Sequence, residues 1–333
     1  MKIIKIALIV MLVALLSFCK TTSNSNDKPN PPSNPTPADG STNVAVNTDL
    51  EWECTDPEGD PLTYDVYLGI DPNPGAAELV AQNIAATLFD PGALNFVTKY
   101  FWKIVADDDS KSTQAGPIWE FTTTGFTEEF NDVAYNFVAE DGRWYTFGGN
   151  LVMEGAENDS WASAYYNQQF SDYTFETRVA RIESAVTEGY TFGVFFRSNG
   201  FMGFDTKSAD GYILSIDAWG EYGVWLIEGG VETEIIPWTY TVNLGLGLNA
   251  FSKVKIVANG SNFDIYFNDI WTDSFSDATF PTGYITLTTW DSVDGDNEIW
   301  WQYYSVAAPE IVKGTSIHHT PVQSDYSSAH SPK

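Results

Sequence analysis

The chain has 333 residues, of which 43% are apolar and 15% aromatic, and its formal net charge at pH 7 is −29. The length and the apolar content predict about two domains with full hydrophobic cores, whereas the acidic balance excludes nucleic acid as a partner by repulsion. All three histidines, His318, His319 and His330, lie in the last sixteen residues, so the rest of the chain has no Ser-His-Asp or Cys-His pair and no imidazole for zinc.

Residues 1–19 predict a segment that directs export. A cationic start, Met1–Lys5, precedes an apolar run, Ile6–Leu16, that is too short to span a bilayer, and Cys19 closes it. This order resembles the signal of bacterial lipoproteins, which implies that Cys19 is lipidated and holds the protein to the cell envelope, at the outer membrane or cell surface. The alternative is an ordinary secretion signal with a chance cysteine. In both cases we expect the mature protein to act outside the cytoplasm.

Residues 20–31 are rich in Pro, Ser and Asn and predict a solvated linker. Residues 32–124 then predict a β-sandwich, because short runs such as 62–68 and 99–106 alternate apolar with polar side chains. Further strands are expected at 50–52 and 118–121. The Pro-rich entry, Trp52 and the Tyr100-x-Trp102 strand resemble fibronectin type III domains, which implies an immunoglobulin-like sandwich that acts as a spacer or stalk.

Two acidic clusters, at 56–60 and 107–109, stand on the turns of this unit. Carboxylates on neighbouring turns are a ligand set for Ca²⁺. Asp, Pro and Gly are equally the residues that turns require, so plain Asp-rich loops are the alternative.

Residues 125–309 predict a second, larger all-β unit, a jelly roll of two packed antiparallel sheets. The sharpest hairpin signal is the turn Asn259–Ser261. The expected strands are 150–154, 173–182, 190–197, 211–217, 223–228, 251–257, 262–267, 283–289 and 299–306.

The order of the motifs in this unit resembles the concanavalin A-like jelly rolls, in particular the laminin-G-like branch with levan-binding modules and 3-keto-disaccharide hydrolase domains. The residues that carry the resemblance are Glu129–Asp132, Phe192–Arg197, Gly211–Asp217, Lys253–Gly260, Phe263–Asp269 and Gly283–Leu287. The resemblance implies the fold. It leaves the function open among lectins, hydrolases and adhesion modules.

Catalysis by this unit is disfavoured by what its strands lack. Glucanases of this fold carry Glu-x-Asp-x-x-Glu on one strand, because retaining hydrolysis needs two carboxyl groups about 5 Å apart. The sequence contains no such run, and Ile213 and Ser215 occupy the strand on which the hydrolase branch carries polar Glu and Gln. We therefore predict no catalytic residues.

Sugar binding requires flat aromatic faces and a few fixed charged groups. Arg197, Asp217, Trp219, Tyr190 and Trp290 lie at or near predicted strand ends and are the candidate ligand-binding residues. For Arg197 the alternative is a structural ion pair or a side chain that lies along the surface. For the tryptophans the alternative is packing in the core.

A metal is a further possibility at the loop that carries Asp294, Asp296 and Glu298. Their spacing does not match an EF-hand, and the alternative to a Ca²⁺ site is a solvated acidic loop. No other cofactor is indicated. Residues 310–333 lack apolar periodicity and predict a disordered tail.

These features together favour an exported cell-surface lipoprotein with a non-catalytic glycan-binding head on a stalk. Its expected partners are a poly- or oligosaccharide, and the membrane through the N-terminal lipid only. Two alternatives stay open: an extracellular glycoside hydrolase or 3-keto-disaccharide hydrolase-like enzyme, and a structural or adhesive module whose exposed aromatic patches bind protein.

Overall fold

The computed structural model describes residues 26–109, 113–131, 134, 136–140, 143–154, 160–183, 190–200, 209–217, 219–245, 247, 249–291, 298–309 and 318–319. Strands and one short 3-10 helix, η1 (Ala76–Glu78), make up the regular structure of these residues. The predicted all-β class is therefore confirmed. Within the same residues, no helix is long and apolar enough to cross a membrane.

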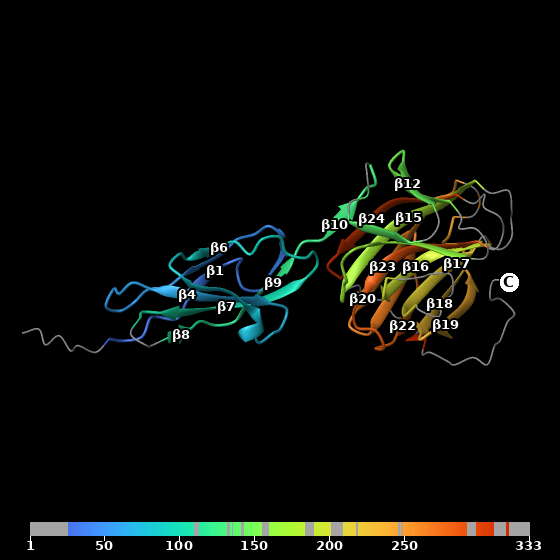
Figure 1. Ribbon diagram of the computed structural model, residues 1–333. Helices are drawn as coiled ribbons and strands as arrows, with labels where there is room; N and C mark the ends of the chain where they lie inside the picture. Colours follow the sequence, from blue (N-terminus) through green and yellow to red (C-terminus); the bar gives the residue numbers. More distant parts are fainter. Residues whose placement is uncertain are drawn as a thin grey trace, which may run out of the picture. The chain divides into compact units, whose positions relative to one another are not determined.

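The chain forms two compact units (Figure 1). Described residues 26–39, 49–91 and 100–120 belong to the first unit, and residues 40–48, 92–99 and those from 121 onward belong to the second. The sheets are described below by the residues that they contain.

Two small sheets form within residues 33–123. One contains β1 (Ser33–Thr36), β3 (Leu50–Glu53) and β6 (Leu88–Phe89), and the other contains β2 (Ser41–Val44), β9 (Trp119–Thr123), β7 (Lys99–Asp107), β4 (Thr63–Gly69), β5 (Leu79–Ile84) and β8 (Thr113–Ala115). In β4 and β7 every second side chain is buried, as the alternation predicts. Trp52 packs edge-on against Tyr64, with ring centroids 5.4 Å apart.

Two larger sheets build the second unit. The back sheet has nine strands: β12 (Arg143–Phe147), β13 (Asn150–Glu154), β24 (Glu298–Ala307), β15 (Tyr173–Glu183), β20 (Ser252–Asn259), β21 (Asn262–Phe267), β22 (Ile270–Ser276), β25 (His318–His319) and, beside β24, β10 (Phe126–Glu128). The front sheet has seven: β11 (Phe137–Glu140), β14 (Ser160–Tyr166), β23 (Tyr284–Asp291), β16 (Tyr190–Ser198), β17 (Gly211–Asp217), β18 (Glu221–Glu228) and β19 (Val231–Tyr240).

Among the described residues from 125 onward, the sequence predicts nine strands and misses β10, β11, β12, β14, β19, β22 and β25. The β20–β21 hairpin forms at the predicted place, with Asn259 opposite Asn262 and Gly260 in the left-handed region at φ +58°. The pattern missed β19, which contains Pro237. Since β19 is the last strand of the front sheet, a residue without an N–H is tolerated there.

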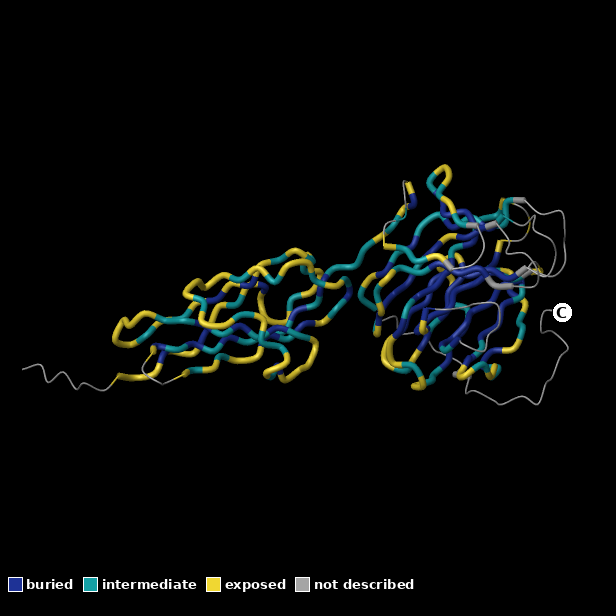
Figure 2. The backbone as a smooth tube through the Cα atoms, viewed as in Figure 1, coloured by how far each residue is buried: buried dark blue, intermediate teal, exposed yellow. Residues whose placement is uncertain are grey.

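The core lies between the front and back sheets, and Figure 2 shows it as the buried strands of the second unit. Tyr212, Leu214 and Ile216 of β17 point into this core. The residues between them are buried as well, and Ile213 packs with Phe195, Ile227 and Ala209 in a separate cluster. Near β17 the front sheet is therefore buried on both faces.

Candidate functional site

Strand pairing brings four of the five predicted ligand-binding residues to one end of the front sheet. Trp290 of β23 pairs with Thr191 of β16, and Thr191 pairs with Asp217 of β17. Because neighbouring strands are about 4.8 Å apart, Trp290 and Asp217 lie about 10 Å apart in one row. Tyr190 begins β16 beside this row, and its side chain lies outside the described residues. Trp219 follows Asp217 in the turn to β18.

Asp217 shapes this turn with its carboxylate. Oδ1 accepts hydrogen bonds from the backbone N–H groups of Trp219, at 2.9 Å, and Glu221, at 2.8 Å. Burial raises the pKa of Asp217 above its usual value of 3.8, and the two N–H donors oppose that shift only in part. Asp217 is thus a fixed, poorly solvated acceptor.

The two predicted tryptophans differ in what they can contact. Trp219 is 55% exposed, whereas Trp290 is only 5% exposed. An exposed indole provides a flat face for a ligand, and a buried one stabilises the sheet. The core alternative therefore describes Trp290, and Trp219 is the accessible aromatic residue at this end.

Arg197 lies at the opposite end of β16, six residues and about 20 Å from Thr191. It is 2% exposed. Its guanidinium donates to the Ser171 carbonyl at 2.7 Å and 3.2 Å and to the Phe280 carbonyl at 3.1 Å, and it lies over the Phe263 ring at 4.8 Å. These contacts match the structural alternative for Arg197, because its donors bond within the protein.

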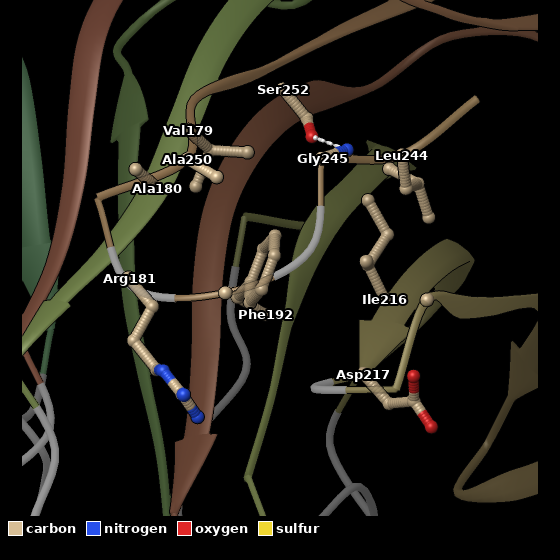
Figure 3. A pocket seen from close by; sticks show the side chains of 12 residues that line it. Val179, Ala180, Arg181, Phe192, Ile216, Asp217, Leu244, Gly245, Ala250 and Ser252 are labelled. Carbon is tan, nitrogen blue, oxygen red and sulfur yellow. Dashed lines mark hydrogen bonds between the residues drawn. The ribbon is translucent and has the colours of Figure 1, made fainter. Parts of the chain in front are cut away.

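A different arginine, Arg181, shares a pocket with Asp217. Arg181 of β15 and Asp217 line one pocket with Phe192 and Ile216. Figure 3 shows the guanidinium and the carboxylate on opposite sides of this pocket, both pointing to the same edge of the view. Sequence reasoning missed Arg181, although it ends a predicted strand just as Arg197 does, because the pairing of β15 with its neighbours was unknown. We call this site the end pocket.

The remaining wall of the end pocket comes from residues 244–252. Leu244, Gly245, Gly247, Ala250 and Ser252 line it, and Ser252 Oγ accepts the N–H of Gly245 at 2.7 Å. The cavity volume is about 20 Å³, which is room for about one water molecule. The pocket thus has space for a single hydroxyl group, and a larger ligand would have to extend out of its mouth.

The predicted metal loop is only partly described. Asp294 and Asp296 lie outside the described residues, as does the predicted lipidation site Cys19. Glu298 begins β24, and its Oε2 accepts the indole N–H of Trp300 at 3.0 Å. In the described part of the chain, no three His, Cys, Asp or Glu side chains are grouped so as to hold a metal ion.

The acidic clusters of the first unit form turn contacts. Asp56 Oδ1 accepts the N–H groups of Glu58 and Asp60 at 2.9 and 3.1 Å, and Asp107 Oδ1 accepts that of Asp109 at 2.8 Å. Such bonds from a side chain to the backbone two to four residues later are what Asp supplies in tight turns. They match the alternative of plain Asp-rich loops.

No protein-family model matches the chain. No curated protein matches it either. Among solved structures, it is similar to a carbohydrate-binding module from Bacillus subtilis, with 21% identity, coverage of 50% of this chain and 91% of that one, and a TM-score of 0.39.

Two further structures are similar over about the same share of the chain. A Bacillus subtilis protein of unknown function with a galectin-like fold has 11% identity, coverage of 56% of this chain and 96% of that one, and a TM-score of 0.43. A β-glucanase from Bacillus licheniformis has 11% identity, coverage of 55% and 97%, and a TM-score of 0.42. At such identities neither a ligand nor a reaction is transferred, so the function has to be argued from the site.

Proposed function

We propose that the second unit is a glycan-binding head without catalytic activity, and that the end pocket anchors the sugar. The observation that carries this proposal is that Arg181 and Asp217 line one pocket (Figure 3) and that the exposed Trp219 follows Asp217 by two residues in the turn to β18. In the same proposal, the protein is exported and lipid-anchored through Cys19, and residues 32–124 form a fibronectin type III-like stalk.

The chemistry of the end pocket suits a sugar better than other ligands. A guanidinium donates several hydrogen bonds and a carboxylate accepts them, so a sugar that spans the pocket has a donor for its oxygens in Arg181 and an acceptor for its hydroxyl groups in Asp217. The apolar face of the sugar ring then has Trp219 to stack on. With opposite charges on the two residues, the site favours a neutral, polyhydroxylated ligand over an ion.

The number of carboxyl groups at the end pocket favours binding without cleavage. Glycoside hydrolysis uses two carboxyl groups on either side of the scissile bond. Among the described residues that line the end pocket, Asp217 is the one carboxylate. The hydrolase alternative would need a second one from elsewhere in the chain.

A glycan array tests the proposal, with product release assayed for every glycan that binds. We expect saturable binding without product, weakened at least tenfold by Trp219→Ala and by Arg181→Ala. Ile270→Ala is the matched control for Trp219→Ala, because Ile270 is 52% exposed and lies at another hairpin turn. Turnover would establish the enzyme instead, and a folded protein that binds no glycan would refute the proposal.

A further inference from the structure

A second concave site lies on the outer face of the back sheet. It is a groove of about 510 Å³, within the range of about 300–1,000 Å³ that is usual for small-ligand sites. Its lining consists of polar residues and one glycine: Thr127, Glu129, Asn131, Gly149, Glu176, Gln302, Tyr303 and Ser305. We call it the back groove. Because the described lining residues have no aliphatic side chains, the back groove favours polar ligands over lipids.

A β-bulge in β24 turns two consecutive side chains into this groove. Thr177 of β15 pairs with Tyr304 and Val179 pairs with Trp301, so Gln302 and Tyr303 together face the single residue between them. Tyr304 and Trp301 are fully buried in the core, which leaves Gln302 and Tyr303 on the outer side. Bulges of this kind re-aim side chains and are frequent beside binding sites. Here the bulge places an amide and a phenol next to each other.

These two side chains keep their hydrogen-bonding capacity for a ligand. Across the described residues, nothing bonds to the Gln302 amide or to the Tyr303 hydroxyl, whereas other groove residues are already oriented. Asn131 Nδ2 donates to Glu129 Oε2 at 3.1 Å, and the hydroxyls of Thr127 and Ser305 are 2.9 Å apart. The groove therefore combines fixed acceptors with available donors and acceptors.

The charge at the floor of the groove is already compensated. Glu176 is paired with Lys253 at 2.9 Å, and Lys253 is paired in turn with Asp269 at 2.7 Å. Lys255 lies 3.9 Å from Glu176 on its other side. A cation would compete with both lysines for Glu176, and an anion would meet Glu129 at the rim. A neutral ligand with many hydroxyl groups is the class that matches.

An aromatic pair stands beside the groove. Phe147, 62% exposed, packs edge-on against Trp300 with centroids 6.0 Å apart, and the Trp300 indole is held by Glu298. Phe147 precedes the hairpin turn at Gly149, whose φ of +75° is one that side chains disfavour and where a Cβ would stand 3.3 Å from Asn131 Oδ1. The turn thus holds an exposed ring at the edge of a polar groove.

We propose that the back groove is a second saccharide-binding site, which takes a neutral sugar on Gln302, Tyr303 and Glu176 with Phe147 at its edge. It lies on the back sheet and shares no residue with the end pocket. Two sites on one head raise the effective affinity for a long polysaccharide, because the second contact becomes intramolecular.

Titration calorimetry of the purified full chain tests this site. The probes are neutral trisaccharides of β-1,3-glucan, β-1,4-glucan, fructan and mannan. The groove variant is Gln302→Ala with Tyr303→Phe, the pocket variant is Arg181→Ala with Asp217→Asn, and Tyr284→Phe on the front sheet is the matched control for the lost tyrosine hydroxyl. Tyr303→Phe alone provides the mildest change if the double variant unfolds.

We expect at least one trisaccharide to bind the native protein with a stoichiometry of two, or to bind the pocket variant still. Adding the groove substitutions to the pocket variant should then weaken the binding that remains at least tenfold. The control variant should retain both sites. A stoichiometry of one that the pocket variant abolishes and the groove variants leave unchanged would overturn the back groove while the end pocket stands. Binding of no probe by the folded protein would overturn both.

Discussion

Replacing Arg197 with alanine should destabilise the second unit without weakening glycan binding by the molecules that remain folded. The guanidinium is 2% exposed and donates to two carbonyl acceptors, those of Ser171 and Phe280. A hydrogen bond from a charged donor contributes about 1.5–3 kcal/mol, so two acceptors give about 3–6 kcal/mol. Asp172, the ionic partner, is 46% exposed and adds little, because solvent screens the pair.

The loss is measurable by thermal or urea denaturation followed by tryptophan fluorescence, since nine of the twelve tryptophans lie in residues 125–309. For a domain of that size, each kcal/mol shifts the melting temperature by about 2–4 °C, which predicts a decrease of about 6–24 °C for Arg197→Ala. Arg197→Lys should fall between the variant and the native protein, because one ammonium group cannot reach both acceptors in the guanidinium geometry.

Arg181→Ala is the matched comparison. It should affect glycan binding more than stability, whereas Arg197→Ala should affect stability more than glycan binding. Removing an end-pocket arginine should weaken glycan binding at least tenfold and lower the unfolding free energy less than Arg197→Ala does, because Arg181 is only half-buried. If Arg197→Ala melts like the native protein and loses binding instead, the assignment of the two arginines is wrong.

Three further outcomes are expected. Because burial raises the pKa of Asp217, acidification should protonate it and weaken glycan binding in a pH range that begins above 3.8, and Asp217→Asn should flatten the binding profile. Gly193→Ala should cost about 3 kcal/mol in a denaturation curve, because a Cβ there collides with the carbonyl oxygen of Leu214 on the paired strand; an unchanged midpoint would contradict this packing. Cys19→Ala should move the protein from the membrane fraction to the soluble fraction on immunoblots, and retention in the membrane would rule out anchoring by lipid at that residue.

The sequence predicted those features that depend on neighbours along the chain. The bounds of β17 are the predicted ones, since turn residues flank a run that is mostly apolar. The β20–β21 hairpin follows from Gly260. Both depend on the backbone preferences of residues that are close in the chain, and these preferences can be read from the sequence pattern.

The site residues depended on pairing between distant strands, which no local pattern contains. Arg181 and Arg197 are both cations near strand ends, and only the register of β15 and β16 decides which of them lines the pocket with Asp217. The bulge at Gln302 and Tyr303 is defined by β15, more than 110 residues earlier in the chain. Trp219 and Trp290 are likewise both tryptophans near strand ends. Their different burial follows from the assembled sheet and not from the sequence around each of them.

The burial of the front sheet on both faces explains why both proposed sites avoid its centre. Phe195 and Ile213 pair across β16 and β17 on the side away from the core, and both are closed off from solvent. A ligand that lay across these strands would have to displace packed apolar side chains at about 1.5–3 kcal/mol each. The accessible polar groups are left at the strand ends around Asp217 and on the back sheet at Tyr303, and a long glycan could reach each without disturbing the core.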